Sequence, residues 1–369
     1  MVALNIVEAA NRATATDKSA GRPYVAVFGG GTSGIGSYAA LALARVHGEV
    51  GEAASRGLRV YILGRRAPDA LLAALRAACP FGTFEVVQAK DLGLLRDVDR
   101  VCELLVATET GYAAKEGHAP KIDLLVASQG IMSFSGRQDT AEGLDWPTAI
   151  AYYGRARLVD RLLPLLTQAV APAAVGHVVW VLNPGLEGDI VTDDLSLRNP
   201  KNFTLRNGGA HLSLFATFYL EALAARHPGT LALVHYYPGL VKTGIAQTSN
   251  LGFFTRALIR VAVPLMRLTS VPEAESGQRI AFLGTTAVYP PAHDTTAAAG
   301  ARKLPEGTSV STGADGTVGS GAYRITYDDE VFKHNDKSAK YREDGTAEKI
   351  YEHTQRAFST IAAGNKFTE

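Results

Sequence analysis

The sequence has few cysteines, no excess of charge of one sign and no long hydrophobic run. Its two cysteines, Cys79 and Cys102, are too few for a disulfide framework and lack the spacing of a metal site. The formal net charge is +1, which gives no electrostatic reason to expect nucleic acid as a partner. No segment reaches the roughly 18 to 20 apolar residues that a membrane-spanning helix requires. We therefore expect no integral membrane segment, no nucleic acid and no metal.

Residues 1–22 contain no uninterrupted apolar core, so we expect neither a signal peptide nor a membrane anchor there. The scarcity of cysteine favours a reducing compartment, and we expect a cytoplasmic protein. With 369 residues, of which 47% are hydrophobic and 20% charged, the composition is that of a soluble globular protein with a substantial core.

Residues 24–45, YVAVFGGGTSGIGSYAALALAR, organise the rest of the chain. Residues 24–28 are typical of a buried strand, and residues 37–45 are rich in the alanine and leucine of a helix. The glycines between them allow a tight turn and a close approach to a pyrophosphate, with the N–H groups of the helix start facing the phosphates. This pattern predicts a dinucleotide cofactor. The predicted contacts in the turn are Gly30, Thr32, Ser33, Gly34, Ile35 and Gly36.

The same alternation of strands and helices continues along the chain. Apolar runs predict further strands at residues 58–63, 83–89, 122–127, 178–182 and 231–236. Helical patterns predict helices at residues 69–78, 94–112, 149–166, 272–288 and 341–362. Regular alternation implies a parallel sheet covered on both faces. The predicted fold is α/β: a single Rossmann-like, doubly wound parallel sheet of strand order 3-2-1-4-5-6, with a C-terminal extension.

The strand at residues 58–63 is followed by Gly64, Arg65 and Arg66, with no acidic residue before Asp69. In a dinucleotide-binding fold, an acid at this point binds the ribose 2′-hydroxyl, whereas an arginine accommodates a 2′-phosphate. The pattern therefore predicts NADP(H). The alternative is two solvated arginines at the end of a strand.

The spacing of Gly30, Gly34 and Gly36 resembles the TGxxxGxG signature of the short-chain dehydrogenase/reductase family, with Gly29 in place of the usual threonine. The resemblance extends to about residue 290. It implies further cofactor contacts: an adenine contact, a segment after the fourth strand where the family has NNAG, and a PG…T segment. These contacts are Asp91, Ser128, Gly130, Pro238, Gly239, Val241 and Thr243.

The resemblance also implies a catalytic set of Asn, Ser, Tyr and Lys, in which the Tyr phenol is the acid/base. The register of the flanking motifs puts Ala151 at the Asn, Asn183 at the Ser, Gly209 at the Tyr and Ser213 at the Lys. No YxxxK occurs between residues 183 and 230. All four catalytic residue types are therefore absent from their positions.

Four residues could take over the chemistry. Tyr152 and Tyr153 lie beside the missing Asn, with aromatic core packing as the alternative. His211 lies between the lost Tyr and Lys positions and could act as an acid/base near pH 7, or be only a surface or capping histidine. Asn183 could donate a hydrogen bond to a carbonyl oxygen.

Beyond Thr243 the chain departs from the minimal fold. Residues 250–268 carry arginines at helical spacing and predict a substrate lid, with a membrane-surface helix as the alternative. Residues 291–321 are rich in Ala, Thr, Gly and Ser, which predicts a loop, although GSGAYRITYDD is typical of a strand that folds back. The expected organisation is an N-terminal segment (1–22), a Rossmann-fold domain (23–290) and an extension packed on it (291–369).

The overall pattern resembles a divergent fungal group of the family that is associated with secondary metabolism. Three functions stay open: an NADP(H)-binding enzyme with a non-standard active site, acting on a small hydrophobic carbonyl or polycyclic substrate by reduction, cyclisation or isomerisation; an NADPH-dependent ketoreductase with a relocated proton donor; and a non-catalytic NADP(H)- or metabolite-binding protein. A homo-oligomer also stays open.

Overall fold

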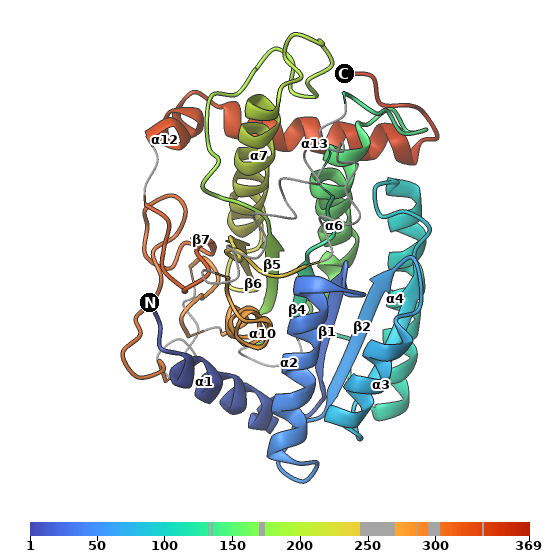
Figure 1. Ribbon diagram of the computed structural model, residues 1–369, viewed down its shortest axis with the longest axis vertical. Coiled ribbons are helices and arrows are strands. Elements are labelled where there is room, and N and C mark those ends of the chain that lie inside the picture. Colours follow the sequence, from blue (N-terminus) through green and yellow to red (C-terminus); the bar gives the residue numbers. More distant parts are fainter. Residues whose placement is uncertain are drawn as a thin grey trace.

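A parallel β-sheet forms the centre of the molecule (Figure 1). The computed structural model describes residues 1–131, 133, 136–169, 174–243, 270–285, 287–293, 303–333 and 336–369. Within these residues seven strands pair in the order β3-β2-β1-β4-β5-β6-β7, all parallel. The strands are β1 (Tyr24–Gly29), β2 (Leu58–Gly64), β3 (Thr83–Gln88), β4 (Leu124–Ala127), β5 (Gly176–Val181), β6 (Leu231–Tyr236) and β7 (Ala322–Ile325). The predicted α/β doubly wound fold is confirmed, and β7 extends it by one strand.

Helices cover both faces of the sheet and bury two separate hydrophobic clusters against it. One face is covered by α4 (Leu95–Glu116), η2 (Ala149–Tyr153), α6 (Gly154–Leu166), α7 (Leu205–Arg226) and α13 (Thr346–Ala362). The other face is covered by α1 (Leu4–Thr16), α2 (Gly34–Val50), α3 (Asp69–Ala78) and α10 (Glu273–Phe282). Because both faces are covered, β1, β2, β4, β5 and β6 are buried along their whole length, and their sequences are continuous apolar runs.

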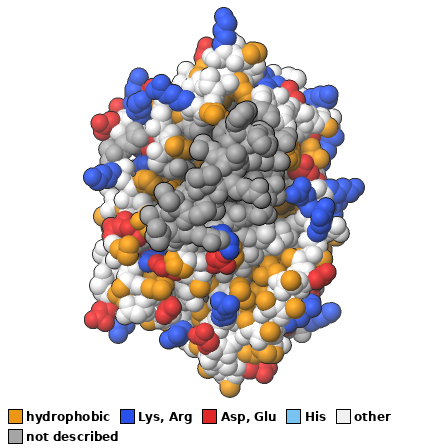
Figure 2. Space-filling view, viewed as in Figure 1, with side chains coloured by type: hydrophobic (Ala, Val, Ile, Leu, Met, Phe, Trp, Pro, Cys, Tyr) orange, Lys and Arg blue, Asp and Glu red, His pale blue; other side chains and the backbone are white. Residues whose placement is uncertain are grey.

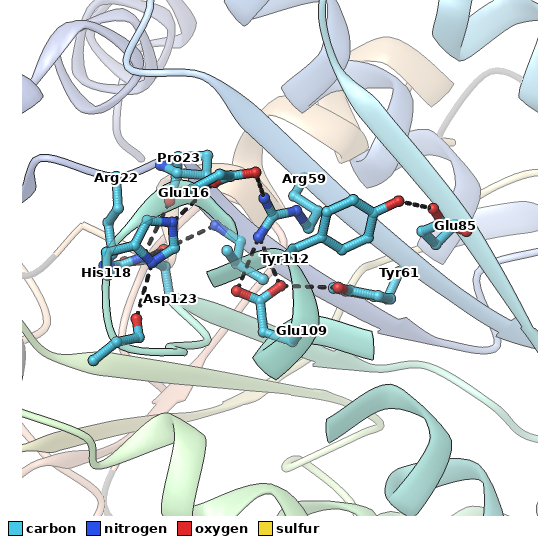
Figure 3. A network of polar contacts seen from close by, with 12 residues as sticks. Arg22, Pro23, Arg59, Tyr61, Glu85, Glu109, Tyr112, Glu116, His118 and Asp123 are labelled. Carbon is cyan, nitrogen blue, oxygen red and sulfur yellow. Dashed lines mark hydrogen bonds and ion pairs between the residues drawn. The ribbon is translucent and has the colours of Figure 1, made fainter. Parts of the chain in front are cut away.

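Buried ion pairs interrupt this apolar interior, and Figure 3 shows one of them between β2 and α4. Arg59, inside β2, is 1% exposed, and its Nη1 donates to both oxygens of Glu109 on α4 at 3.0 and 2.9 Å. Tyr61 donates its hydroxyl to the same carboxylate at 2.8 Å. The pair therefore fixes α4 on β2. Removing Arg59 would leave the Glu109 carboxylate buried without its charge partner, whereas Arg59 also pairs with Glu116.

The extension contributes elements that the sequence predicts only in part. The strand expected to fold back is β7, which pairs with β6. The expected closing helix is two helices, α12 (Asp336–Glu343) and α13, because Gly345 adopts a left-handed φ of 78° between them. Figure 1 shows α13 lying across α6 and α7.

Three other differences concern helix ends and segments. The predicted helix at residues 272–288 ends at Phe282, and the one at residues 149–166 begins with the wider π-helical turn η2, preceded by the short α5 (Trp146–Thr148). The N-terminal segment contains α1 and a 3₁₀ turn, η1 (Lys18–Ala20), neither of which was predicted. The predicted lid at residues 250–268 lies outside the described residues. None of the helices in the described part of the chain is both long and apolar enough to cross a membrane.

Candidate functional site

The glycine turn between β1 and α2 has a geometry that side chains would disrupt. Gly30 and Gly34 adopt left-handed φ values of 78° and 62°. A Cβ on Gly30 would lie 2.6 Å from the backbone nitrogen of Gln129, and one on Gly36 would lie 2.7 Å from Oγ of Ser128. The turn is thus packed against the segment that follows β4, and only glycine permits this approach.

The start of α2 faces the same turn. Ser33 is the N-cap residue, and its side chain makes no capping hydrogen bond. The first N–H groups of a helix have no intrahelical acceptor and carry the positive end of the helix dipole. Ile35 packs on the core cluster below, so its contact with a ligand would come from its backbone N–H. This cradle fits the pyrophosphate of a dinucleotide.

The carboxyl end of β2 lies beside the turn. Thr32 packs against Gly64, which brings Arg65 and Arg66 next to the glycine turn. Both arginines are exposed, and neither forms an ion pair with a described residue. Their exposed guanidinium groups beside the turn fit a 2′-phosphate.

The segment after β6 lies against the glycine turn. Pro238 is buried, Gly239 has a φ of 70°, and Val241 forms an isolated bridge with Val271. Cγ2 of Thr243 would lie 3.2 Å from a Cβ on Gly34. The structure thus brings the PG…T segment against the glycine turn, and its contact with a cofactor stays a prediction.

Asp91 has internal partners for both carboxylate oxygens. Oδ1 accepts from the N–H of Gly93 at 2.8 Å, and Oδ2 accepts from Nε1 of Trp146 at 2.9 Å. The carboxylate therefore ties the loop after β3 to α5, a structural role that the sequence did not predict. Its adenine contact stays a prediction.

Tyr152 and Tyr153 are core residues in this structure. They are 0% and 2% exposed. Their hydroxyls hydrogen-bond to Oγ1 of Thr354 and Nε2 of His353, both on α13, at 2.7 Å each. Burial raises the pKa of Tyr153 to about 12. The geometry favours the packing alternative, because both phenols are hydrogen-bonded to α13, and their catalytic role stays a prediction.

The side chain of His211 is also hydrogen-bonded within the protein. Its Nε2 accepts from the N–H of Val191 at 2.9 Å, and its Nδ1 lies 3.2 Å from the carbonyl of Leu195. Burial lowers the pKa of His211 to about 4, so the imidazole is neutral at pH 7. Both ring nitrogens thus hold the loop between β5 and α7, which favours a structural role, and the role of His211 as a proton donor stays a prediction.

The residues at the positions of the absent catalytic set have small side chains or polar atoms without a hydrogen-bond partner among the described residues. Among the described residues, a Cβ on Gly209 would meet only Cδ1 of Leu186, at 3.6 Å, so these residues leave space above this part of α7. Ser213, one turn further, is 1% exposed, and its Oγ has no hydrogen-bond partner among the described residues. Asn183 accepts from the N–H of Gly185 at 3.0 Å through Oδ1, which leaves its Nδ2 without a hydrogen bond to a described residue. Asn183 and Ser213 are therefore the polar groups that remain.

Arg155 is the residue that sequence reasoning missed. It is 2% exposed. Its Nε donates to the carbonyl of Gln129 at 2.8 Å, and its Nη1 donates to the carbonyl of Val181 at 2.5 Å. It thus ties together the carboxyl ends of β4 and β5. Burial lowers its pKa to about 9, and no described carboxylate pairs with it.

The spacing of Arg155 from neighbouring leucines in the sequence indicates that its side chain is buried. It precedes Leu158 and Leu162 by three and seven residues, so it lies on the apolar stripe of α6. Arg157 and Arg161, by contrast, form ion pairs with Asp99 at the surface of α4. A charged residue in register with buried leucines predicts a buried role.

The distribution of surface charge and of metal-ligating side chains bears on the class of ligand. On the face in Figure 2, the described Lys and Arg side chains (blue) mix with Asp and Glu side chains (red), so they create no field of one sign. Within the described ranges, His, Cys, Asp and Glu side chains form no group of three that could hold a metal ion.

Comparison with known proteins identifies relatives over most of the chain. No family model matches. The short-chain dehydrogenase/reductase SAT2 of Stachybotrys chartarum is 30% identical over 359 residues, which cover 96% of this chain and 97% of that protein. The oxidoreductase andH of Emericella variicolor is 34% identical over 340 residues, covering 91% and 92%. The NmrA-like family domain-containing oxidoreductase notO of an Aspergillus species is 37% identical over 270 residues, covering 72% and 71%.

Solved structures resemble the chain in shape. The Pseudomonas aeruginosa RhlG/NADP active-site complex has a TM-score of 0.49 at 16% identity and covers 73% of this chain and 92% of that one. Levodione reductase has a TM-score of 0.49 at 18% identity, covering 72% and 92%. At these values the similarity says nothing about the reaction.

Proposed function

This chain belongs to the short-chain dehydrogenase/reductase family, and we propose that it binds NADP(H) and converts a small hydrophobic carbonyl or polycyclic substrate without the family's usual proton donor. The observation that carries the proposal is the pair Gly209 and Ser213, one turn apart on α7, where the register puts the Tyr and Lys. The fungal origin of the curated relatives supports a secondary-metabolite type of substrate. The two free, buried cysteines fit the cytoplasm, the compartment we propose.

The cofactor site would be held by three parts of the chain. The glycine turn and the start of α2 would bind the pyrophosphate, Arg65 and Arg66 the 2′-phosphate, and the segment from Pro238 to Thr243 the nicotinamide end. A bound NADP(H) supplies a hydride donor or acceptor to a family member. The intact glycine turn is what supports the cofactor.

The chain's own groups beside that site favour binding and orientation. The space above Gly209 would admit a substrate ring, and the amide of Asn183 and the hydroxyl of Ser213 would donate hydrogen bonds to its oxygens. Orientation and preorganised donors can accelerate cyclisation or isomerisation with no net oxidation. We therefore propose a non-redox conversion as the principal activity.

The second candidate is NADPH-dependent ketone reduction. Thr243 and the glycine turn are in mutual contact, which is the arrangement that a nicotinamide-dependent reductase needs. The proton would then come from water, because His211, Tyr152 and Tyr153 are bonded elsewhere. A non-catalytic NADP(H)- or metabolite-binding protein is the third.

The test supplies a panel of polyketide-like and terpenoid ketones with NADPH, with NADP⁺ or with no cofactor, and follows product mass and absorbance at 340 nm. The proposal expects a product of unchanged oxidation state and no NADPH consumption. Stoichiometric NADPH consumption would establish the reductase instead. NADPH binding with no product from any substrate would favour the binding protein.

Ser213→Ala sharpens this test. Its Oγ is buried and unpartnered, so its removal should leave stability unchanged and lower turnover by about tenfold or more if it donates to the substrate. Ser276→Ala is the matched control, because Ser276 is also buried with an unpartnered Oγ but lies on α10, on the opposite face of the sheet. Equal effects of the two changes would contradict a site role for Ser213.

A further inference from the structure

A cavity lies at the amino ends of the strands, whereas the glycine turn lies at their carboxyl ends. Its volume is about 750 Å³, and it lies between α1, the start of β1 at Tyr24 and the segment at residues 303–306. Tyr24 and Gly29 are the two ends of β1, so at about 3.3 Å per residue the cavity is roughly 17 Å from the cofactor turn. A cavity of this size is in the range of small-molecule sites.

The wall of this cavity is mostly apolar. Small and branched side chains come from α1 on one side and from the other segments around it. They are Ile6, Ala9, Ala10, Ala13, Val175, Leu304 and Pro305. Such a surface would accommodate the hydrocarbon part of a ligand.

The charged groups of the cavity differ in how many of their hydrogen bonds are formed within the protein. Asp123 accepts from both terminal nitrogens of Arg22, at 2.7 and 2.6 Å, and from the N–H of Val25 at 2.8 Å (Figure 3). These bonds and the arginine hold the pKa of Asp123 below its usual range against the effect of burial, so the carboxylate is ionised. Its hydrogen-bonding capacity is largely used by these partners.

Arg56 is a charged group of the cavity that keeps an unused hydrogen-bond donor. Its side chain is 8% exposed, and its Nη2 lies 4.0 Å from Asp123. Nε donates to the carbonyl of Arg22 at 3.3 Å, but Nη2 has no hydrogen-bond partner among the described residues. Thr285, also in the wall, has a buried Oγ1 that is likewise unpartnered there. A buried donor without an acceptor is costly, so a ligand acceptor would be stabilising.

We propose that this cavity binds a monocarboxylic acid with an apolar body, its carboxylate accepting from Arg56 and its body lying along α1. A planar guanidinium prefers a carboxylate, and Arg22 and Arg56 together exceed the single buried acid, Asp123. The other acids of the wall, Asp17 and Glu306, are exposed, and Asp17 already accepts from the N–H of Ser19. The inference is independent of the proposed function.

The experiment titrates the full chain with decanoate, with 1-naphthoate and with decan-1-ol by calorimetry, with and without NADPH. We expect at least one acid to bind while the alcohol binds at least about tenfold more weakly, because the alcohol lacks the charge. The two acids distinguish a lipid-like chain from an aromatic metabolite. NADPH should not compete with the acid, because the two sites lie at opposite ends of the strands.

Two variants assign the site. Arg56→Gln should weaken acid binding by about tenfold or more. Ala13→Trp should abolish it by filling the cavity from the exposed side of α1, which leaves the core intact. Arg12→Gln is the matched control, since Arg12 lies on the same helix and outside the cavity, and it should bind as the unmodified chain does.

Three outcomes would overturn the proposal. They are absence of binding by both acids, equal binding by Arg56→Gln and Arg12→Gln, and displacement of decanoate by NADPH. The thermal unfolding of each variant is measured alongside, so that a change in binding is compared only between folded proteins.

Discussion

Replacing Gly30 with alanine should disrupt the cofactor turn. The residue has a φ of 78°, which costs an L-residue about 1–2 kcal/mol. The new Cβ would also lie 2.6 Å from the nitrogen and 2.7 Å from the Cα of Gln129, so backbone must move by about 0.8 Å to reach ordinary contact at 3.4 Å. Both neighbours are backbone atoms, which cannot rotate away. We expect the free energy of unfolding to fall by more than about 1–2 kcal/mol.

The assay is urea unfolding together with the thermal stabilisation that NADPH produces. Gly30→Ala should lower the first and remove the second, because the displaced turn no longer presents its N–H groups to the pyrophosphate. Gly111→Ala is the control: it lies inside α4, and a Cβ there would meet nothing within 4 Å. This change should stabilise by up to about 1 kcal/mol. A Gly30→Ala protein with unchanged stability and an unchanged NADPH response would refute the argument.

Further changes test other parts of the site. Arg65→Asp should weaken NADPH binding by about tenfold or more in calorimetry, and equal affinities of the unmodified chain for NADPH and NADH would contradict the assignment. Gly209→Tyr combined with Ser213→Lys should block turnover of the native substrate, and a gain in ketone reduction would instead support the reductase. His211→Ala should lower the free energy of unfolding by about 1–3 kcal/mol with little effect on the catalytic rate of the folded enzyme, because it leaves two loop groups unpaired. Since burial lowers the pKa values of His211 and His353 to about 4, their contribution to stability is present above pH 6.5 and is lost as the pH falls toward 4, which urea unfolding across that range would measure.

The sequence predicts the fold well because the signals are local. Strands buried on both faces have to be continuous apolar runs, and residues 231–236 therefore predict β6 with its observed bounds. The glycine turn is equally local: a left-handed φ and close backbone contacts have no other solution than glycine at Gly30. Where a helix ends is less local, and α10 stops at Phe282, six residues before the predicted end.

The partners of the predicted catalytic residues could not be read from the sequence. Tyr152 and Tyr153 are bonded to Thr354 and His353, about 200 residues later, and no periodicity reveals such a partner. His211 is held by the loop between β5 and α7, whose conformation depends on the complete fold. A phenol or imidazole near an expected site is available for chemistry only if the remaining chain does not use it.

Arg155 shows how the carboxyl edge of the sheet is held where the family has NNAG. A guanidinium has five N–H donors, so one side chain bonds the carbonyls of Gln129 and Val181 at the ends of neighbouring strands. A lysine would offer one nitrogen and could not reproduce this planar bridge. With a pKa of about 9, reduced by burial, Arg155 still carries its charge at pH 7. The strand ends that support the proposed nicotinamide site are therefore fixed by a buried cation, which explains how this edge keeps its geometry after the change to Ser128 and Gln129.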